Sequence, residues 1–144
     1  MITIIKCDLF KLDTSYALCH CISSDFKLGA GIAKVFADKG VKQCLTNKYP
    51  KVWCGSGFCL QTKATEFVCE YNLVTKEHYW DKPTLQTLES ALLLMRYNAI
   101  QNGIKKIAMP KIGCGLDKLS WGDVSALLHR IFDDTDIAIT VCML

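Results

Sequence analysis

Short, mostly apolar runs alternate with amphipathic stretches along this chain, and the alternation predicts a mixed α/β domain. The strand-like runs lie at 2–5, 16–22, 58–62, 67–75, 107–109 and 137–144. Helix-like spacing of apolar residues is found at 32–39, 41–49, 85–103 and around 124–131. Because 144 residues form one domain of ordinary size, we expect a single unit, 1–144, with helices on both faces of a central sheet.

Two of the expected helices have start signals in the sequence. Thr84 is a good N-cap for the clearest helix, whose apolar stripe is Leu85, Leu88, Leu92, Met95 and Ala99. Ser120, with Asp123 three residues later, predicts a capping box before the stripe Val124, Leu127, Leu128 and Ile131.

Two glycine-bearing turns indicate a binding function. The first is Gly29-Ala30-Gly31-Ile32-Ala33, which leads into a helix, and the second runs from Lys111 to Asp117. Glycine has no Cβ, so backbone N–H groups can crowd around an anion, and a helix N-terminus adds partial positive charge. One such turn is a weak signal, but two in one small domain favour a bound diphosphate. Ligands of α/β sheets bind beyond the carboxyl ends of the strands. Because they follow three of the expected strands, Ser23, Gly29, Lys76 and Asp117 should lie together in one crevice.

Composition argues against a membrane protein and against a disulfide-bonded one. The chain is 51% hydrophobic and 22% charged, and no apolar run approaches the roughly 20 residues of a membrane span. No signal peptide is recognisable, so we expect the protein inside the cell, in the nucleus or the cytoplasm. Nine irregularly spaced cysteines without a Cys-x-x-Cys pair indicate reduced thiols. In a strand Cys19 and Cys21 would face away from His20, so neither a metal site nor a cofactor is expected.

A lysine-rich stretch leaves one kind of partner open. The net charge of +3 does not by itself imply nucleic acid, but five lysines between 34 and 51 are offset only by Asp38: Lys34, Lys39, Lys42, Lys48 and Lys51. A solvated basic face is the favoured interpretation, and an anionic macromolecular partner is the alternative. We expect a monomer.

Seven segments, read in chain order, resemble the macrodomain, the fold that binds ADP-ribose. Within it they resemble the terminal ADP-ribose protein glycohydrolases, also described as O-acetyl-ADP-ribose deacetylases. The segments are CDLF at 7–10, HCIS at 20–23, GAGIA at 29–33, LVTK at 73–76, KPT at 82–84, MPKIGCGLD at 109–117 and the final Leu144. They span essentially the whole chain. The resemblance implies a three-layer α/β/α fold with a mixed sheet, and a hydrolase that acts on ADP-ribosylated proteins and deacylates O-acetyl-ADP-ribose.

The resemblance also implies how ADP-ribose would be held. Asp8 would accept a hydrogen bond from the adenine amino group, although alone it reads as a turn or cap residue. Leu9 would pack beside the base, Ser23 would lie near the distal ribose, and the glycine turns would wrap the diphosphate and that ribose. The expected substrate-binding residues are Asp8, Leu9, Ser23, Gly29, Gly31, Ile32, Thr75, Pro110, Lys111, Ile112, Gly113, Cys114, Gly115, Leu116 and Leu144.

Catalysis in this subclass is assigned to a lysine and an aspartate, which match Lys76 and Asp117. Without the resemblance, a solvated lysine and a helix cap would be the preferred interpretations. An ordinary lysine amine is uncharged in about one molecule in 2,500 at pH 7, so a nucleophilic lysine needs a desolvated or cation-rich setting. We expect Lys76 to attack the distal ribose and displace a glutamate or aspartate carboxylate, with Asp117 as acid and base.

Departures from the family pattern keep other functions open. Cys7 replaces the glycine that commonly precedes the adenine-binding aspartate, and Cys142 stands where relatives can offer an aromatic ring, so adenine binding would be weaker. His20 to Ser23 replaces an Asn-Ala-Ala-Asn pattern, which disfavours direct attack by water. Cys114 lacks an identifiable histidine base and is disfavoured as a nucleophile. The alternatives are a non-catalytic ADP-ribose reader, an ADP-ribose 1″-phosphate phosphatase, and an enzyme whose ADP-ribosylated carrier is nucleic acid.

Overall fold

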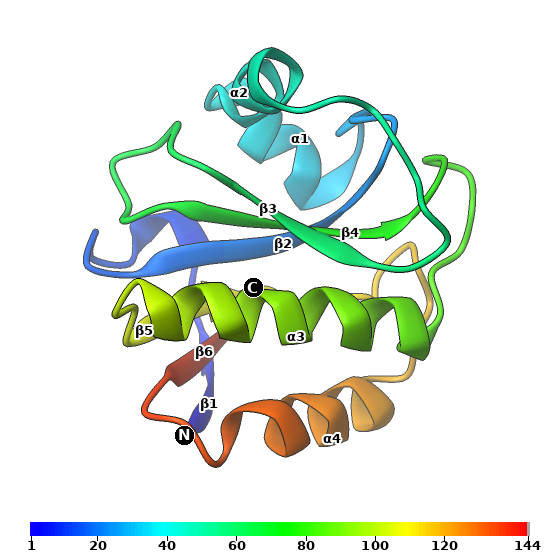
Figure 1. Ribbon diagram of the computed structural model, residues 1–144. Helices are drawn as coiled ribbons and strands as arrows, with labels where there is room; N and C mark the ends of the chain where they lie inside the picture. Colours follow the sequence, from blue (N-terminus) through cyan, green and yellow to red (C-terminus); the bar gives the residue numbers. More distant parts are fainter. Residues whose placement is uncertain (144) are drawn as a thin grey trace.

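The computed structural model describes residues 1–143 and contains one six-stranded sheet flanked by helices (Figure 1). The strands are β1 Ile2–Lys6, β2 Ala17–Ser23, β3 Phe58–Thr62, β4 Glu70–Lys76, β5 Lys106–Met109 and β6 Ala138–Met143. The helices are α1 Gly31–Asp38, α2 Val41–Lys48, α3 Leu85–Gln101 and α4 Trp121–Phe132, and a short 3₁₀ helix covers Leu9–Lys11. None of the helices within the described residues is long and apolar enough to cross a membrane.

The sheet is mixed, as predicted. Its strand order is β1-β6-β5-β2-β4-β3, in which every neighbouring pair is parallel except β3 and β4. The parallel strands β2, β4 and β5 therefore end at the same edge of the sheet. That edge is where the segments after these strands can meet.

Alternation along β2 divides the interior into two cores. Cys19 packs with α3 and α4 in one cluster, while Leu18 and Ile22 pack with α1 and α2 in the other. His20, one residue on from Cys19, faces the second side and stacks on Phe36 of α1 with ring centroids 3.8 Å apart. Helices thus cover both faces of the sheet, and the predicted three-layer α/β/α fold is confirmed.

Three local predictions were wrong. Ser120 occupies the N-cap of α4 but makes no side-chain capping hydrogen bond, so the capping box is absent. Strand β4 begins at Glu70 rather than at 67, although Val68 N still donates to Tyr16 O in the preceding segment. Leu85 begins α3 on the surface with 37% exposure, whereas the other four residues of its predicted stripe are fully buried.

Candidate functional site

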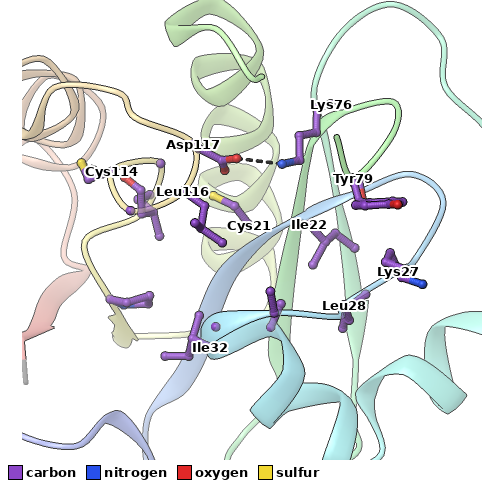
Figure 2. Close-up of a pocket in the computed structure, with 18 of the residues that line it drawn as sticks. Cys21, Ile22, Lys27, Leu28, Ile32, Lys76, Tyr79, Cys114, Leu116 and Asp117 are labelled. Atoms are coloured by element: carbon purple, nitrogen blue, oxygen red, sulfur yellow. Dashed lines mark hydrogen bonds and ion pairs between the residues drawn. The ribbon is translucent and has the colours of Figure 1, made fainter. Parts of the chain in front are cut away.

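A pocket of about 510 Å³ lies at the carboxyl edge of the parallel strands. Its walls come from the end of β2, the segment 27–33 that enters α1, Lys76 at the end of β4, and the loop 110–117 that follows β5. Figure 2 shows these segments facing one another around the pocket. The convergence predicted from strand order is therefore present.

Lys76 and Asp117 meet in this pocket. Lys76 Nζ donates to Asp117 Oδ1 at 2.7 Å, although the two residues are 41 positions apart (Figure 2). Their side chains are only 14% and 16% exposed. With so little exposure, Lys76 is not the solvated lysine that the sequence alone suggests. Asp117 is not a helix cap, because the N-cap of α4 is Ser120.

The segment between β2 and α1 is folded into an unusual backbone shape. Phe26 and Leu28 have φ of 54° and 43°, which is rare for residues with a Cβ, and Gly31 has φ of 58°. Burial of Phe26 and Leu28 offsets this strain, since they are 1% and 6% exposed. The segment holds Gly29, Ala30 and Gly31 exposed at the pocket wall and delivers them to the N-terminus of α1.

Asp25 ties this segment to the loop after β4. Its carboxylate accepts hydrogen bonds from Ser23 Oγ at 2.6 Å, from Lys27 N at 3.0 Å and from Tyr79 N at 2.9 Å. These bonds hold the pKa of Asp25 below its usual value against the opposing effect of burial, the largest single cause. Ser23 is thereby fixed at the pocket with its hydroxyl already used as a donor.

The second glycine turn differs from the prediction in one respect. Gly113 has φ of 74°, and Leu119 N donates to Gly113 O at 2.7 Å, which closes the turn. However, α4 begins only at Trp121, so no helix N-terminus follows Asp117 directly. The favourable helix dipole applies to the first turn alone, and the second turn offers backbone groups without it.

Two cysteine thiols also line the pocket. Burial, with a smaller contribution from the Asp117 carboxylate, raises the pKa of the Cys21 thiol far above its usual value. Burial also raises the pKa of Cys114, whose Sγ donates to Ile112 O at 3.4 Å. Both thiols are therefore held in the neutral form, which disfavours a cysteine nucleophile here.

Most predicted site residues line the pocket, and a few do not. Those that line it are Ser23, Gly29, Gly31, Ile32, Lys76 and all of 110–117, including Asp117. Leu9 and Thr75 are buried at 3% and 1% exposure, and the Thr75 Oγ1 has no hydrogen-bond partner among the described residues. Asp8 caps the 3₁₀ helix by accepting from Phe10 N at 3.0 Å, outside the pocket lining. Leu144 lies outside the described residues.

Sequence reasoning missed several lining residues. Lys82 donates from Nζ to Leu116 O at 2.7 Å and so braces the second turn. Tyr79 is 54% exposed at the pocket, with Lys27 Nζ 5.4 Å from its ring centroid (Figure 2). The KPT segment was a usable signal for Lys82, whereas nothing in the sequence connected Tyr79 with Lys27.

The three-layer fold with this pocket at the edge of its sheet is that of a macrodomain, and comparison with known proteins supports this class. Residues 19–128 match the family model of the Macro domain. The human protein named ADP-ribose glycohydrolase OARD1 is 40% identical over 141 residues, which cover 97% of this chain and 90% of that protein. The chain therefore belongs to the macro domain family.

More distant relatives match either in structure or over part of the sequence. The macrodomain of Mycobacterium tuberculosis DarG matches with a TM-score of 0.81 at 24% identity, covering 100% of this chain and 98% of that one. A fusion protein of Thermosipho africanus, named a DNA ADP-ribosyl transferase and DNA ADP-ribosyl glycohydrolase, is 33% identical over 67 residues. That match covers 46% of this chain and 17% of the fusion protein.

Proposed function

We propose that this protein is a hydrolase that removes ADP-ribose from glutamate and aspartate side chains of proteins, using Lys76 as nucleophile and Asp117 as acid and base. The observation that carries the proposal is the sheltered contact of 2.7 Å between Lys76 Nζ and Asp117 Oδ1 in the pocket. The relative named ADP-ribose glycohydrolase, 40% identical along nearly the whole chain, supports the same activity.

The pocket walls suit a dinucleotide-like ligand. A diphosphate would lie between the exposed backbone of 29–31, at the N-terminus of α1, and the turn 111–117. Asp8 would receive the adenine amino group beyond the lining of the pocket. The distal ribose then falls toward Ser23, Lys76 and Asp117, where the reaction takes place.

The lysine must lose a proton before it can attack, because an ammonium has no free electron pair. Asp117 is the acceptor already in contact with Nζ. The amine forms a bond to the anomeric carbon of the distal ribose, and the bond from that carbon to the carboxylate oxygen of the carrier breaks. The electron pair leaves with the carboxylate, a good leaving group. Water then releases ADP-ribose and restores Lys76, with Asp117 moving the proton.

Turnover of glutamate-ADP-ribosylated protein tests the proposal. Asp117→Ala should slow release of ADP-ribose by about 100-fold to 10,000-fold, the usual size of an acid-base effect, and Lys76→Ala by at least as much. Lys48→Ala, a change at an exposed lysine of α2, is the matched control and should retain wild-type turnover. Reductive trapping should capture an adduct on Lys76.

The same experiment separates the alternative functions. Wild-type turnover in Lys76→Ala would refute the mechanism. Binding of ADP-ribose without turnover by the wild-type protein would indicate a reader, and preferential release of phosphate from a 1″-phosphorylated ligand would indicate a phosphatase. Release of acetate from O-acetyl-ADP-ribose, lost in Lys76→Ala, would extend the same site to deacylation.

A second candidate carrier is nucleic acid, favoured by the aromatic surface at the pocket mouth. Trp80 is 64% exposed and stacks on His78 with ring centroids 4.4 Å apart. It also contacts the ring of Tyr79, over which Lys27 Nζ lies. Exposed aromatic rings beside lysines can stack on unpaired bases. The name of the Thermosipho africanus relative includes a DNA ADP-ribosyl glycohydrolase. Release of ADP-ribose from a modified single-stranded oligonucleotide, weakened by salt and by Trp80→Ala, is the expected result.

A further inference from the structure

Two cysteines lie side by side, one just after the first strand and the other near the end of the last. Cys7 Sγ donates to Cys142 Sγ at 3.3 Å, although the residues are 135 positions apart. Among residues 1–143 no other pair of cysteine sulfurs is in hydrogen-bond contact. The contact joins the end of β1 to β6, which are parallel neighbours.

The strand register explains why the sulfurs meet. Ile5 of β1 lies opposite Cys142 of β6, and Cys7 follows Ile5 by two residues, so its side chain is on the same face of the sheet. Cys7 N donates to Met143 O at 2.8 Å, which holds the backbone beyond β1 against β6. Both side chains belong to the core under α1 and α2. The contact is therefore fixed by backbone pairing rather than by a mobile loop.

We propose that Cys7 and Cys142 form a reversible disulfide that regulates the adenine end of the ligand site. A disulfide needs the sulfurs about 2.05 Å apart, so the pair has to close by only about 1.3 Å. The effect of this disulfide on ADP-ribose binding rests on the proposed function, since it assumes that Asp8 receives adenine. Formation of the disulfide does not depend on that function.

The two thiols differ in access, which sets the order of the chemical steps. Cys142 is 6% exposed, and burial raises the pKa of its thiol to about 12. Cys7 is only partly buried. With glutathione disulfide as the oxidant, the Cys7 thiolate attacks one oxidant sulfur, the oxidant S–S bond breaks, and one glutathione thiol leaves. Cys142 then gives up its proton and attacks the Cys7 sulfur, and the second glutathione thiol leaves. Two protein thiols lose two electrons, and the oxidant gains them.

Closing the pair would act on Asp8 directly. Asp8 follows Cys7 directly in the chain, and its carboxylate accepts a hydrogen bond from Phe10 N, so Asp8 moves with the start of the 3₁₀ helix. Leu9, next in the chain, packs in the same core cluster as Cys142. Drawing Cys7 toward β6 pulls on both residues. We therefore expect the oxidised protein to bind ADP-ribose about 5-fold more weakly or worse.

Peptide mapping tests the disulfide without any ligand. Trypsin should release Cys7 in the peptide 7–11 and Cys142 in the peptide 131–144. After treatment with glutathione disulfide, mass spectrometry should find these two peptides cross-linked, and dithiothreitol should separate them. Cys7→Ser and Cys142→Ser should each abolish the cross-link, while Cys54→Ser, at an exposed cysteine elsewhere, should keep it. Absence of the cross-link in the wild-type protein overturns the proposal.

Calorimetric titration with ADP-ribose tests the regulation. The oxidised wild-type protein and oxidised Cys54→Ser should bind more weakly than their reduced forms, and Cys7→Ser should bind equally under both conditions. Unchanged or tighter binding by the cross-linked protein overturns the regulatory effect. If the reduced protein binds no ADP-ribose, the proposed function fails, and the cross-linked peptides still decide whether the disulfide exists.

Discussion

At the scale of one residue, a substitution at Gly115 can test ligand binding without disturbing folding. Its backbone needs no positive φ, an added Cβ would meet no atom within 4 Å, and it lines the pocket. Gly115→Ala should therefore change the free energy of unfolding by less than about 1 kcal/mol. The added methyl should nevertheless weaken ADP-ribose binding by occupying space beside the turn. Urea unfolding and calorimetric titration measure the two effects.

Gly113 in the same turn provides the contrast. It has φ of 74°, and an added Cβ would lie 2.9 Å from Leu119 Cδ1. Gly113→Ala should lose stability as well as affinity, because the strain is in the protein itself. Equal ADP-ribose affinity in wild type and Gly115→Ala would contradict the placement of the ligand on this turn.

Strand order alone could bring Ser23, Gly29, Lys76 and Asp117 to one edge of the sheet, but their roles needed the family resemblance. Lys76 and Asp117 look like ordinary surface residues until strand order brings them to one edge, and the 2.7 Å contact between them depends on the whole sheet. Phe26 and Leu28 show the opposite limit. Their left-handed backbone was not predictable, because large apolar residues avoid it unless the surrounding core holds them there.

At the scale of elements, the approach of β3 to α3 depends on Gly57. A Cβ at this position would lie 1.8 Å from the backbone oxygen of Thr87 and 3.2 Å from that of Val74. Neither backbone atom can move without shifting α3 or β4. Gly57→Ala should therefore destabilise the protein by about 3 kcal/mol or more, as measured by chemical denaturation.

Gly55, two residues earlier, is the matched control. It has φ of 90° but no neighbour near an added Cβ, so Gly55→Ala should cost only about 1 kcal/mol of backbone strain. Similar losses in the two variants would show that the clash at Thr87 is relieved by a small shift. The two glycines at 55 and 57 are visible in the sequence, but the position of a helix thirty residues away is not.

Local sequence signals predict the capping of one helix N-terminus and fail at another. Thr84 caps α3 as predicted, with Thr84 Oγ1 accepting from Thr87 N and Thr87 Oγ1 accepting from Thr84 N, both at 3.1 Å. Ser120 has an equally good local pattern and makes no such bond. Ser120 directly follows a closed loop, in which Leu119 N donates to Gly113 O. The strand at 58–62 was predicted at its observed bounds.

Across the whole molecule, the sheet carries a buried histidine at its centre. His20 is fully buried on β2, stacks on Phe36, and has Nε2 2.6 Å from Asn72 Oδ1 on β4, while its Nδ1 has no partner among the described residues. Burial lowers the pKa of His20 from 6.5 to about 4, against the smaller opposing effect of the bond to Asn72. The folded protein thus keeps this ring neutral where the unfolded chain would protonate it.

Acid should therefore destabilise the whole fold through this one ring. Above pH 6.5 both states hold a neutral His20, and the ring makes no difference to stability. As the pH falls from about 6.5 to 4, only the unfolded chain gains the proton, so the free energy of unfolding should fall by about 3 kcal/mol. His20→Gln cannot titrate and should lack this part of the loss, although the carboxylates still contribute theirs. Urea unfolding at several pH values, taken as the difference between wild type and His20→Gln, measures it. Parallel curves for the two proteins between pH 4 and 6.5 would show that the folded protein admits the proton.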